Sequence, residues 1–224
     1  RLKDSIGISI AEDNREVVAN SKFIFLAVPA IFYPNVVREV ADLASPDHIF
    51  VSLTPGYTLQ RFHDEFGDAI RVVRIMPNTP AFVAQGMTAV CMPGLSPEEE
   101  AEFHQVLSSF GQVEVLPERL MDVIVSVTGS SPAYVYMMIE AMGDAAVSIG
   151  LSRDSAYRLA AQALIGSATM VRDTGKHPGA LKDDVCTPGG TTIQAVRVLE
   201  ERGFRSALFE AMLKCHFAGA APTT

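Results

Sequence analysis

The residue types best suited to chemistry gather in the segment C-T-P-G-G-T-T at residues 186–192. Gly189 and Gly190 allow the backbone to approach a ligand closely. A helix predicted to begin directly after them offers free N–H groups and the positive end of its dipole, which suit a small anion such as a carboxylate. Thr191 and Thr192 add hydroxyl groups that can donate to the same ligand. An ordinary helix start with a flexible lead-in explains the segment equally well.

Polar or Pro-containing segments also follow three predicted strands: A-V-P-A at 27–30, T-P-G at 54–56 and P-N-T-P at 77–80. In an open α/β sheet, ligands bind beyond the carboxyl ends of the strands. These segments are therefore candidates for one common site. No strand in the chain is followed by the G-x-G-x-x-G pattern of dinucleotide-binding loops, and the five histidines lack metal-ligand spacing. We expect no metal site.

Composition excludes several classes of protein. The 224 residues are 48% apolar and 20% charged, which excludes a disordered chain. A net charge of −8 argues against nucleic acid or an anionic membrane surface as a partner. The three cysteines are widely spaced and predict no disulfide framework, so we expect a cytoplasmic protein. The uncharged run at residues 123–139 contains Ser, Thr, Gly and Pro and predicts a buried helix rather than a membrane span.

Strands and helices alternate in the first half of the chain. We predict a strand buried on both faces at residues 23–28 and further strands at 49–53, 71–76, 87–92 and 113–116. Helices are predicted at 14–20, 34–44 and 58–66, with a further helix announced by the capping pattern S-P-E-E at 96–99. This order predicts a mostly parallel α/β sheet.

Strand patterns disappear after about residue 117, and Ala, Leu and Met dominate. We therefore predict two domains, residues 1–117 and 118–224, the second all-helical with helices at 154–172, 191–202 and 204–217. Met137, Met138 and Met142 crowd a helix that is apolar on more than one side. Such a helix must be buried by other helices, which predicts a homodimer. A monomeric helical bundle is the alternative.

Several segments together resemble the pyrroline-5-carboxylate reductase family. They are F-L-A-V (25–28), R-I-M-P-N-T-P (74–80), T-G-S-S-P-A-Y (128–134), H-P-G-A-L-K-D-D-V (177–185), C-T-P-G-G-T-T-I (186–193) and A-V-R-V-L-E-E-R-G-F-R (195–205). The resemblance runs from Arg1 to about Cys215, and its P-G-G-T-T segment is the most specific part. It implies a Rossmann-like NAD(P)-binding domain followed by a helical domain that forms a homodimer, in some members further assembled into a decamer.

The family reaction, as the resemblance implies it, transfers hydride from NADPH or NADH to the C=N carbon of Δ1-pyrroline-5-carboxylate and gives L-proline. Thr192 matches the threonine that contacts the ring nitrogen, which makes it the candidate catalytic residue. Candidates for binding the substrate carboxylate are Thr187, Gly189, Gly190 and Thr191. Candidates for cofactor binding are Asn14, Ala27, Val28, Thr54, Pro55 and Asn78.

The resemblance also implies a strand and a G-x-G-x-x-G loop upstream of Arg1, so the expected fold is a partial Rossmann-like parallel sheet with its N-terminal strands and glycine loop missing. Two other functions stay open. One is a β-hydroxyacid or 6-phosphogluconate dehydrogenase-like enzyme, for which Lys176 and Lys182 are the candidate catalytic lysines. The other is an inactive truncated fragment that serves only as a dimerisation module.

Overall fold

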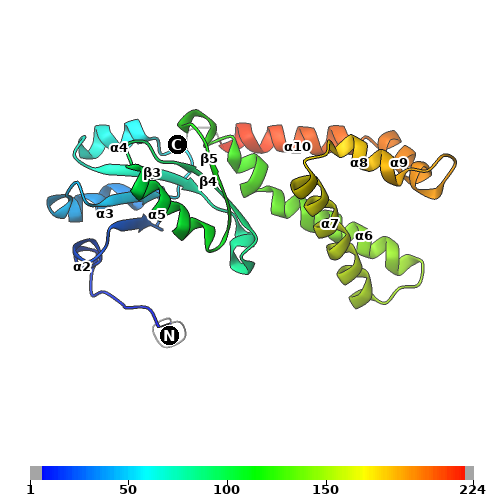
Figure 1. Ribbon diagram of the computed structural model, residues 1–224, viewed down its shortest axis with the longest axis horizontal. Coiled ribbons are helices and arrows are strands. Elements are labelled where there is room, and N and C mark those ends of the chain that lie inside the picture. The colour runs from blue at the N-terminus through cyan, green and yellow to red at the C-terminus, as the bar shows by residue number, and fades with distance from the viewer. Residues whose placement is uncertain (1–6, 220–224) are drawn as a thin grey trace. The chain divides into compact units, whose positions relative to one another are not determined.

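The structure is a computed structural model that describes residues 7–219 (Figure 1). Its described residues fall into two compact units, one formed by residues 7–129 with 215–219 and the other by residues 130–214. This division falls later in the chain than the domain boundary predicted at residue 118. No described helix is long and apolar enough to cross a membrane.

The first unit is built on a five-stranded sheet of order β1-β2-β3-β4-β5 (Figure 1). The strands are β1 (Phe23–Leu26), β2 (Ile49–Ser52), β3 (Arg71–Met76), β4 (Gly86–Cys91) and β5 (Gly111–Val115). Three neighbouring pairs are parallel, and β3 with β4 is antiparallel. The predicted α/β class with a mostly parallel sheet is therefore confirmed.

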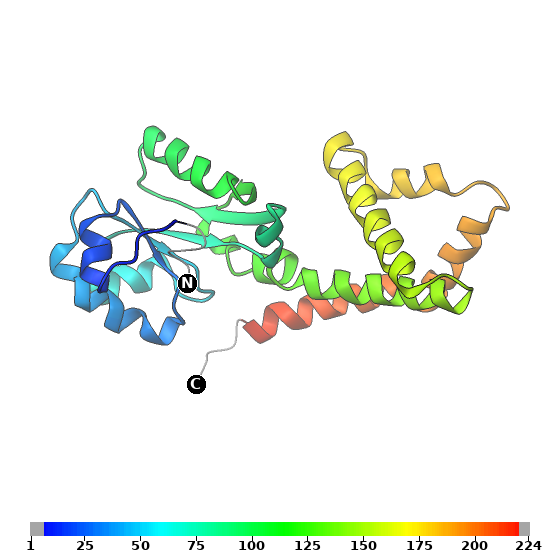
Figure 2. The ribbon, with the colours of Figure 1, turned by 90° about the horizontal axis from the view of Figure 1, so that it is seen from below.

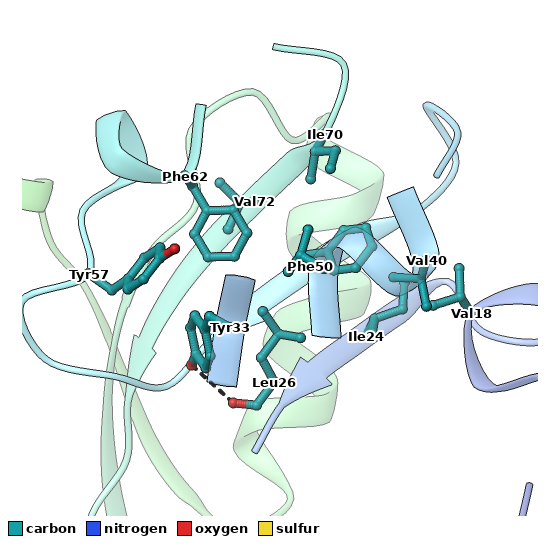
Figure 3. Packing of buried hydrophobic residues seen from close by; sticks show 11 residues of the cluster. Val18, Ile24, Leu26, Tyr33, Val40, Phe50, Tyr57, Phe62, Ile70 and Val72 are labelled. Carbon is teal, nitrogen blue, oxygen red and sulfur yellow. Dashed lines mark hydrogen bonds between the residues drawn. The ribbon is translucent and has the colours of Figure 1, made fainter. Parts of the chain in front are cut away.

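Helices cover both faces of this sheet, as Figure 2 shows. Phe50 of β2 points to the face covered by α2 (Asn14–Ala19), α3 (Tyr33–Val40) and α4 (Leu59–Phe66) (Figure 3). Its neighbours Ile49 and Val51 point to the other face and pack with Phe103 and Leu107 of α5 (Pro97–Ser108). The alternation follows from the two-residue period of a strand, so one buried strand supplies both cores.

The prediction that the first strand is buried on both faces is wrong for β1. Ile24 and Leu26 are buried, but Phe25 is 39% exposed. Among the described residues β1 has a hydrogen-bonded neighbour only in β2 and forms an edge of the sheet. The ring centroid of Phe25 lies 6.2 Å from that of Phe103, so α5 covers this face of β1 incompletely.

The helix starts predicted from polar residues are confirmed. The Ser96 hydroxyl accepts from the Glu99 N–H, while the Glu99 carboxylate accepts from the Ser96 N–H at 2.8 Å, which makes a capping box at the start of α5. The Thr58 hydroxyl accepts from the Arg61 N–H at the start of α4. Short 3₁₀ segments connect other elements: η1 (Ala30–Phe32), η2 (Ala41–Leu43), η3 (Thr79–Val83) and η4 (Glu118–Leu120).

The second unit is helical and buries little of its apolar surface within one chain. Its helices are α6 (Ser131–Ser148), α7 (Arg153–Thr174), α8 (Pro178–Val185), α9 (Thr191–Glu201) and most of α10 (Phe204–Gly219). Gly143 of α6 is buried against the Tyr157 ring of α7. Tyr136 and Met137 of α6 are 59% and 69% exposed. These exposed apolar residues on α6 agree with the prediction that helices of a second copy of the chain pack against it.

Candidate active site

The segment before α9 is a tight turn whose shape depends on its Pro-Gly pair. The Gly190 N–H donates to the Thr187 carbonyl at 3.0 Å, and Gly189 has a φ of +72°. Pro188 and Gly189 thus occupy the central positions of a type II β-turn, where proline fixes the first φ and glycine permits the positive one. The turn ends where the helix begins.

Gly190 is required here for a second reason, which is steric. A Cβ atom on Gly190 would lie 2.4 Å from Oγ1 of Thr187, far inside van der Waals contact. Gly190 is also the N-cap residue of α9, and no side chain caps this helix end. The first N–H groups of a helix lack partners within the helix, so this end offers donors to an anion.

The predicted substrate residues lie together at this helix start. Thr187, Gly189 and Thr191 are exposed, whereas Gly190 and Thr192 are half-buried. They surround the N-terminal end of α9 with backbone N–H groups and three hydroxyls. The arrangement suits a small carboxylate with a further hydrogen-bonding group nearby.

The two candidate lysines of the dehydrogenase alternative carry ion pairs. Lys182 pairs with Asp183, and its hydrogen bond to this carboxylate raises the pKa of the lysine. Lys176 lies 3.3 Å from Asp184. A general base must be neutral near the working pH, which requires a lowered lysine pKa. The pairing of Lys182 therefore favours a structural role over a catalytic one.

In the first unit, Tyr33 joins the carboxyl ends of β1 and β2. Its buried hydroxyl donates to the Leu26 carbonyl at 3.0 Å, a bond drawn in Figure 3. The same oxygen accepts from the Thr54 hydroxyl at 2.9 Å and from the Leu53 N–H at 3.2 Å. These bonds fix the strand ends that lead into the predicted cofactor residues Ala27, Val28, Thr54 and Pro55.

Asn14, Ala27 and Val28 line one cavity of about 140 Å³ together with apolar residues of β1, α2 and α3. Pockets that enclose drug-sized ligands measure roughly 300–1,000 Å³, so this cavity fits part of a dinucleotide and not the whole. The Asn14 side-chain amide donates to Glu39 at 2.9 Å, which fixes its orientation at the start of α2. The residues present therefore fit one portion of a nicotinamide cofactor.

Asn78 has both ends of its side chain engaged with the backbone. Its Nδ2 donates to the Thr128 carbonyl at 3.0 Å, and its Oδ1 accepts from the Met87 N–H at 2.9 Å. Thr128 lies in η5 (Val125–Gly129), a π-helical turn directly before α6. Asn78 thus holds the end of β3 to the start of β4 and to this turn.

An ion-pair cluster around Arg74 was not predicted from the sequence. Arg74 lies in β3, is 2% exposed, and pairs with Glu118 and Asp122. The signal that reveals it is an arginine within the apolar strand V-V-R-I-M. Nearby Cys91 is buried, and this burial, with a smaller contribution from Glu118, raises the pKa of its thiol. A raised pKa disfavours the reactive thiolate.

Two family models match the chain. Residues 118–219 match pyrroline-5-carboxylate reductase dimerisation, and residues 1–56 match NADP oxidoreductase coenzyme F420-dependent. The chain therefore carries an NADP-binding region followed by a dimerisation domain, and the predicted homodimer agrees with the dimerisation match at residues 118–219.

Similar proteins cover nearly the whole chain. The pyrroline-5-carboxylate reductase of Escherichia coli (strain K12) is 49% identical over 96% of this chain and 80% of that protein. A solved structure of a pyrroline-5-carboxylate reductase from Coxiella burnetii has a TM-score of 0.89 at 30% identity, covering 97% of this chain and 82% of that one. A Plasmodium falciparum pyrroline carboxylate reductase with NADP bound has a TM-score of 0.86 at 25% identity, covering 96% and 82%. The chain belongs to the pyrroline-5-carboxylate reductase family of oxidoreductases.

Proposed function

We propose that residues 187–192 hold Δ1-pyrroline-5-carboxylate during its reduction to L-proline. The observation that carries this proposal is the uncapped start of α9, reached through the type II turn at Pro188 and Gly189. The N–H groups of this helix end bind the substrate carboxylate. The hydroxyls of Thr187 and Thr191 add donors to the same carboxylate.

Thr192 orients and polarises the ring nitrogen of the substrate. NADPH, or NADH, supplies the hydride when it is bound. A cyclic imine accepts hydride readily when its nitrogen is protonated or strongly hydrogen-bonded. The pKa of a free threonine hydroxyl is too high for an efficient acid, so the proton comes from solvent or arrives with the iminium form of the substrate. The main contribution of this chain is then to hold the ring in a reactive orientation.

On the cofactor side, we assign binding to Asn14, Ala27, Val28, Thr54, Pro55 and Asn78. Three of them line the cavity of about 140 Å³ beside β1, and Thr54 is tied to the end of β1 through Tyr33. Asn78 acts through its backbone contacts, because its side chain already binds Thr128 and Met87.

We further propose a dimerisation domain that begins at residue 118, where the family match begins, and a first domain of residues 1–117. The exposed apolar residues of α6 support burial against a second copy of the chain. Assembly of dimers into a decamer and a cytoplasmic location complete the proposal. None of the three cysteines forms a disulfide within the described part of the chain, which fits a reducing compartment.

The variant Thr192→Ala tests the role of this hydroxyl, with Thr192→Ser as the matched variant that keeps it. Losing one preorganised donor at the reacting centre lowers kcat by about 100-fold. The serine variant should stay within about 10-fold of the unchanged protein, because its hydroxyl can still donate. NADPH affinity, measured by fluorescence titration, should not change in either. An alanine variant with unchanged turnover would show that Thr192 has another role.

Gly190→Ala tests the carboxylate site separately. The added Cβ forces the Thr187 side chain away from its position, since the two atoms would lie 2.4 Å apart. We expect a higher KM for the pyrroline and an unchanged KM for NADPH. An equal rise in both constants would contradict the assignment of this turn to the substrate.

A further inference from the structure

Arg74 is a buried cation on a strand that is otherwise apolar. Its guanidinium donates to Glu118 at 3.1 Å and to Asp122 at 2.8 Å. Burying an arginine is costly unless its charge is paired and its donors are bonded. The two carboxylates meet this requirement, and they come from the segment that follows β5.

Each of these carboxylates also accepts a hydrogen bond from the backbone of the segment between β2 and α4. Oδ1 of Asp122 accepts from the Gly56 N–H at 3.1 Å, and Oε1 of Glu118 accepts from the Leu59 N–H at 2.6 Å. Leu59 is the first residue of α4, where N–H groups lack partners within the helix. Gly56 has a φ of +72° directly after Pro55. Arg74 therefore orients two acceptors that hold the middle of this segment at Gly56 and its far end at Leu59.

The segment is also fixed on its other side, because Thr54 donates to the Tyr33 hydroxyl at 2.9 Å. Thr54 and Pro55 thus lie between two anchors, Tyr33 and the Arg74 cluster. We propose that Arg74 is a positioning residue for hydride transfer, which acts through Glu118 and Asp122 to fix Thr54 and Pro55 where the nicotinamide cofactor binds. This inference rests on the proposed function, which assigns these two residues to the cofactor.

Asp122 is the residue of choice for the test, because its side chain is 45% exposed and its loss should be tolerated by the fold. Asp122→Ala removes the acceptor for the Gly56 N–H, whereas Asp122→Asn keeps an oxygen in the same place. Glu102→Ala is the control. It removes an exposed ion pair with Lys22, which lies just before β1 at the opposite end of the strand from Ala27.

In the full-length protein, we expect Asp122→Ala to lower kcat about 10-fold and to raise KM for NADPH about 5-fold, since small misplacements reduce rates strongly. KM for the pyrroline should stay within about 2-fold, because its site is assigned to residues 187–192. Asp122→Asn should recover most of the lost activity, and Glu102→Ala should match the unchanged protein. Arg74→Lys, which keeps the charge but loses the rigid fork that donates to both carboxylates, should fall between Asp122→Ala and Asp122→Asn.

Hydrogen exchange gives a readout that does not depend on activity. The Gly56 and Leu59 amides should exchange faster in Asp122→Ala than in Asp122→Asn or Glu102→Ala, with the Gly56 amide changing most. Equal exchange and equal kcat in Asp122→Ala and Glu102→Ala would overturn the positioning role of Arg74. Loss of activity that Asp122→Asn does not recover would overturn it as well. If the protein without any substitution cannot reduce the pyrroline, the proposed function itself is contradicted, whatever the variants show.

Discussion

Replacing Tyr33 by phenylalanine tests how the ends of β1 and β2 are held together. The substitution keeps the buried ring, which packs with Tyr57 at 5.0 Å and with Phe62 at 6.0 Å between centroids. It removes only the hydroxyl that donates to the Leu26 carbonyl and accepts from Leu53, from Thr54 and, at 3.5 Å, from Ser52. Four groups lose a partner, and no cavity larger than one oxygen atom is made.

The size of the effect depends on which of the groups that lose the Tyr33 hydroxyl can hydrogen-bond to water instead. Thr54 is half-buried and its hydroxyl can rotate toward another partner, so the loss of its bond to Tyr33 contributes little. Leu26 is buried and Leu53 is half-buried. Leaving such backbone groups without partners costs about 1–3 kcal/mol each, less where water reaches them. We therefore expect Tyr33→Phe to lower the free energy of unfolding by about 2–3 kcal/mol.

Urea denaturation followed by circular dichroism measures this change, and Tyr57→Phe is the matched control. Tyr57 is equally buried, but among the described residues its hydroxyl has one hydrogen-bond partner, Glu65. Glu65 keeps its bond to Arg61 and part of its exposure to water when the Tyr57 hydroxyl is removed. We expect the control to lose about 1 kcal/mol or less. Equal losses in the two variants would refute the claim that Tyr33 joins the strand ends.

Three further predictions concern other parts of the chain. Gly143→Ala should destabilise the helical unit, because the added Cβ would lie 2.5 Å from the Tyr157 ring of α7. At Gly166 in the middle of α7 an added Cβ meets no atom within 4 Å, so Gly166→Ala should stabilise the helical unit by about 0.5–1 kcal/mol. Thermal unfolding measures both changes. A hydrogen bond from Arg71 lowers the pKa of Glu99 from 4.5 to about 2, so its stabilising effect is present above its ordinary pKa and is lost as the pH falls toward 2. When the pH falls from neutral to about 3, the free energy of unfolding should therefore decrease less in the Glu99→Gln variant than in the protein without the substitution. An equal decrease in the two proteins would count against the Arg71–Glu99 pair. Met138→Asp should give monomers or unfolded protein in sedimentation experiments, and a stable dimer of this variant would exclude Met138 from the interface.

Local signals in the sequence predicted much of the fold. The S-P-E-E pattern at 96–99 located the start of α5, because capping chemistry acts between residues a few positions apart. The five strands were also located from short segments of sequence, because the residue pattern of a strand is likewise local. The exposure of Phe25 was not predictable in this way, since it depends on whether another element lies beside β1.

In the candidate site, too, the local features were predictable and the contacts between distant residues were not. The helix start directly after Gly189 and Gly190 was predicted, because it depends on consecutive residues, whereas the type II turn before it was not. The contacts of Asn78 with Thr128 and of Arg74 with Asp122 join residues far apart in the chain. Such contacts depend on strand order and packing, which the pattern of residue types does not specify. The arginine within an apolar strand is the signal in the sequence for this cluster, and it does not identify the partners.

The most direct test measures NADPH oxidation and L-proline formation together, with Δ1-pyrroline-5-carboxylate as substrate and the full-length protein as enzyme. We predict one proline formed for each NADPH consumed, and loss of this turnover in Thr192→Ala while NADPH still binds. Bound NADPH without pyrroline reduction, or full turnover in Thr192→Ala, would contradict the central claim that the start of α9 holds the substrate for hydride transfer.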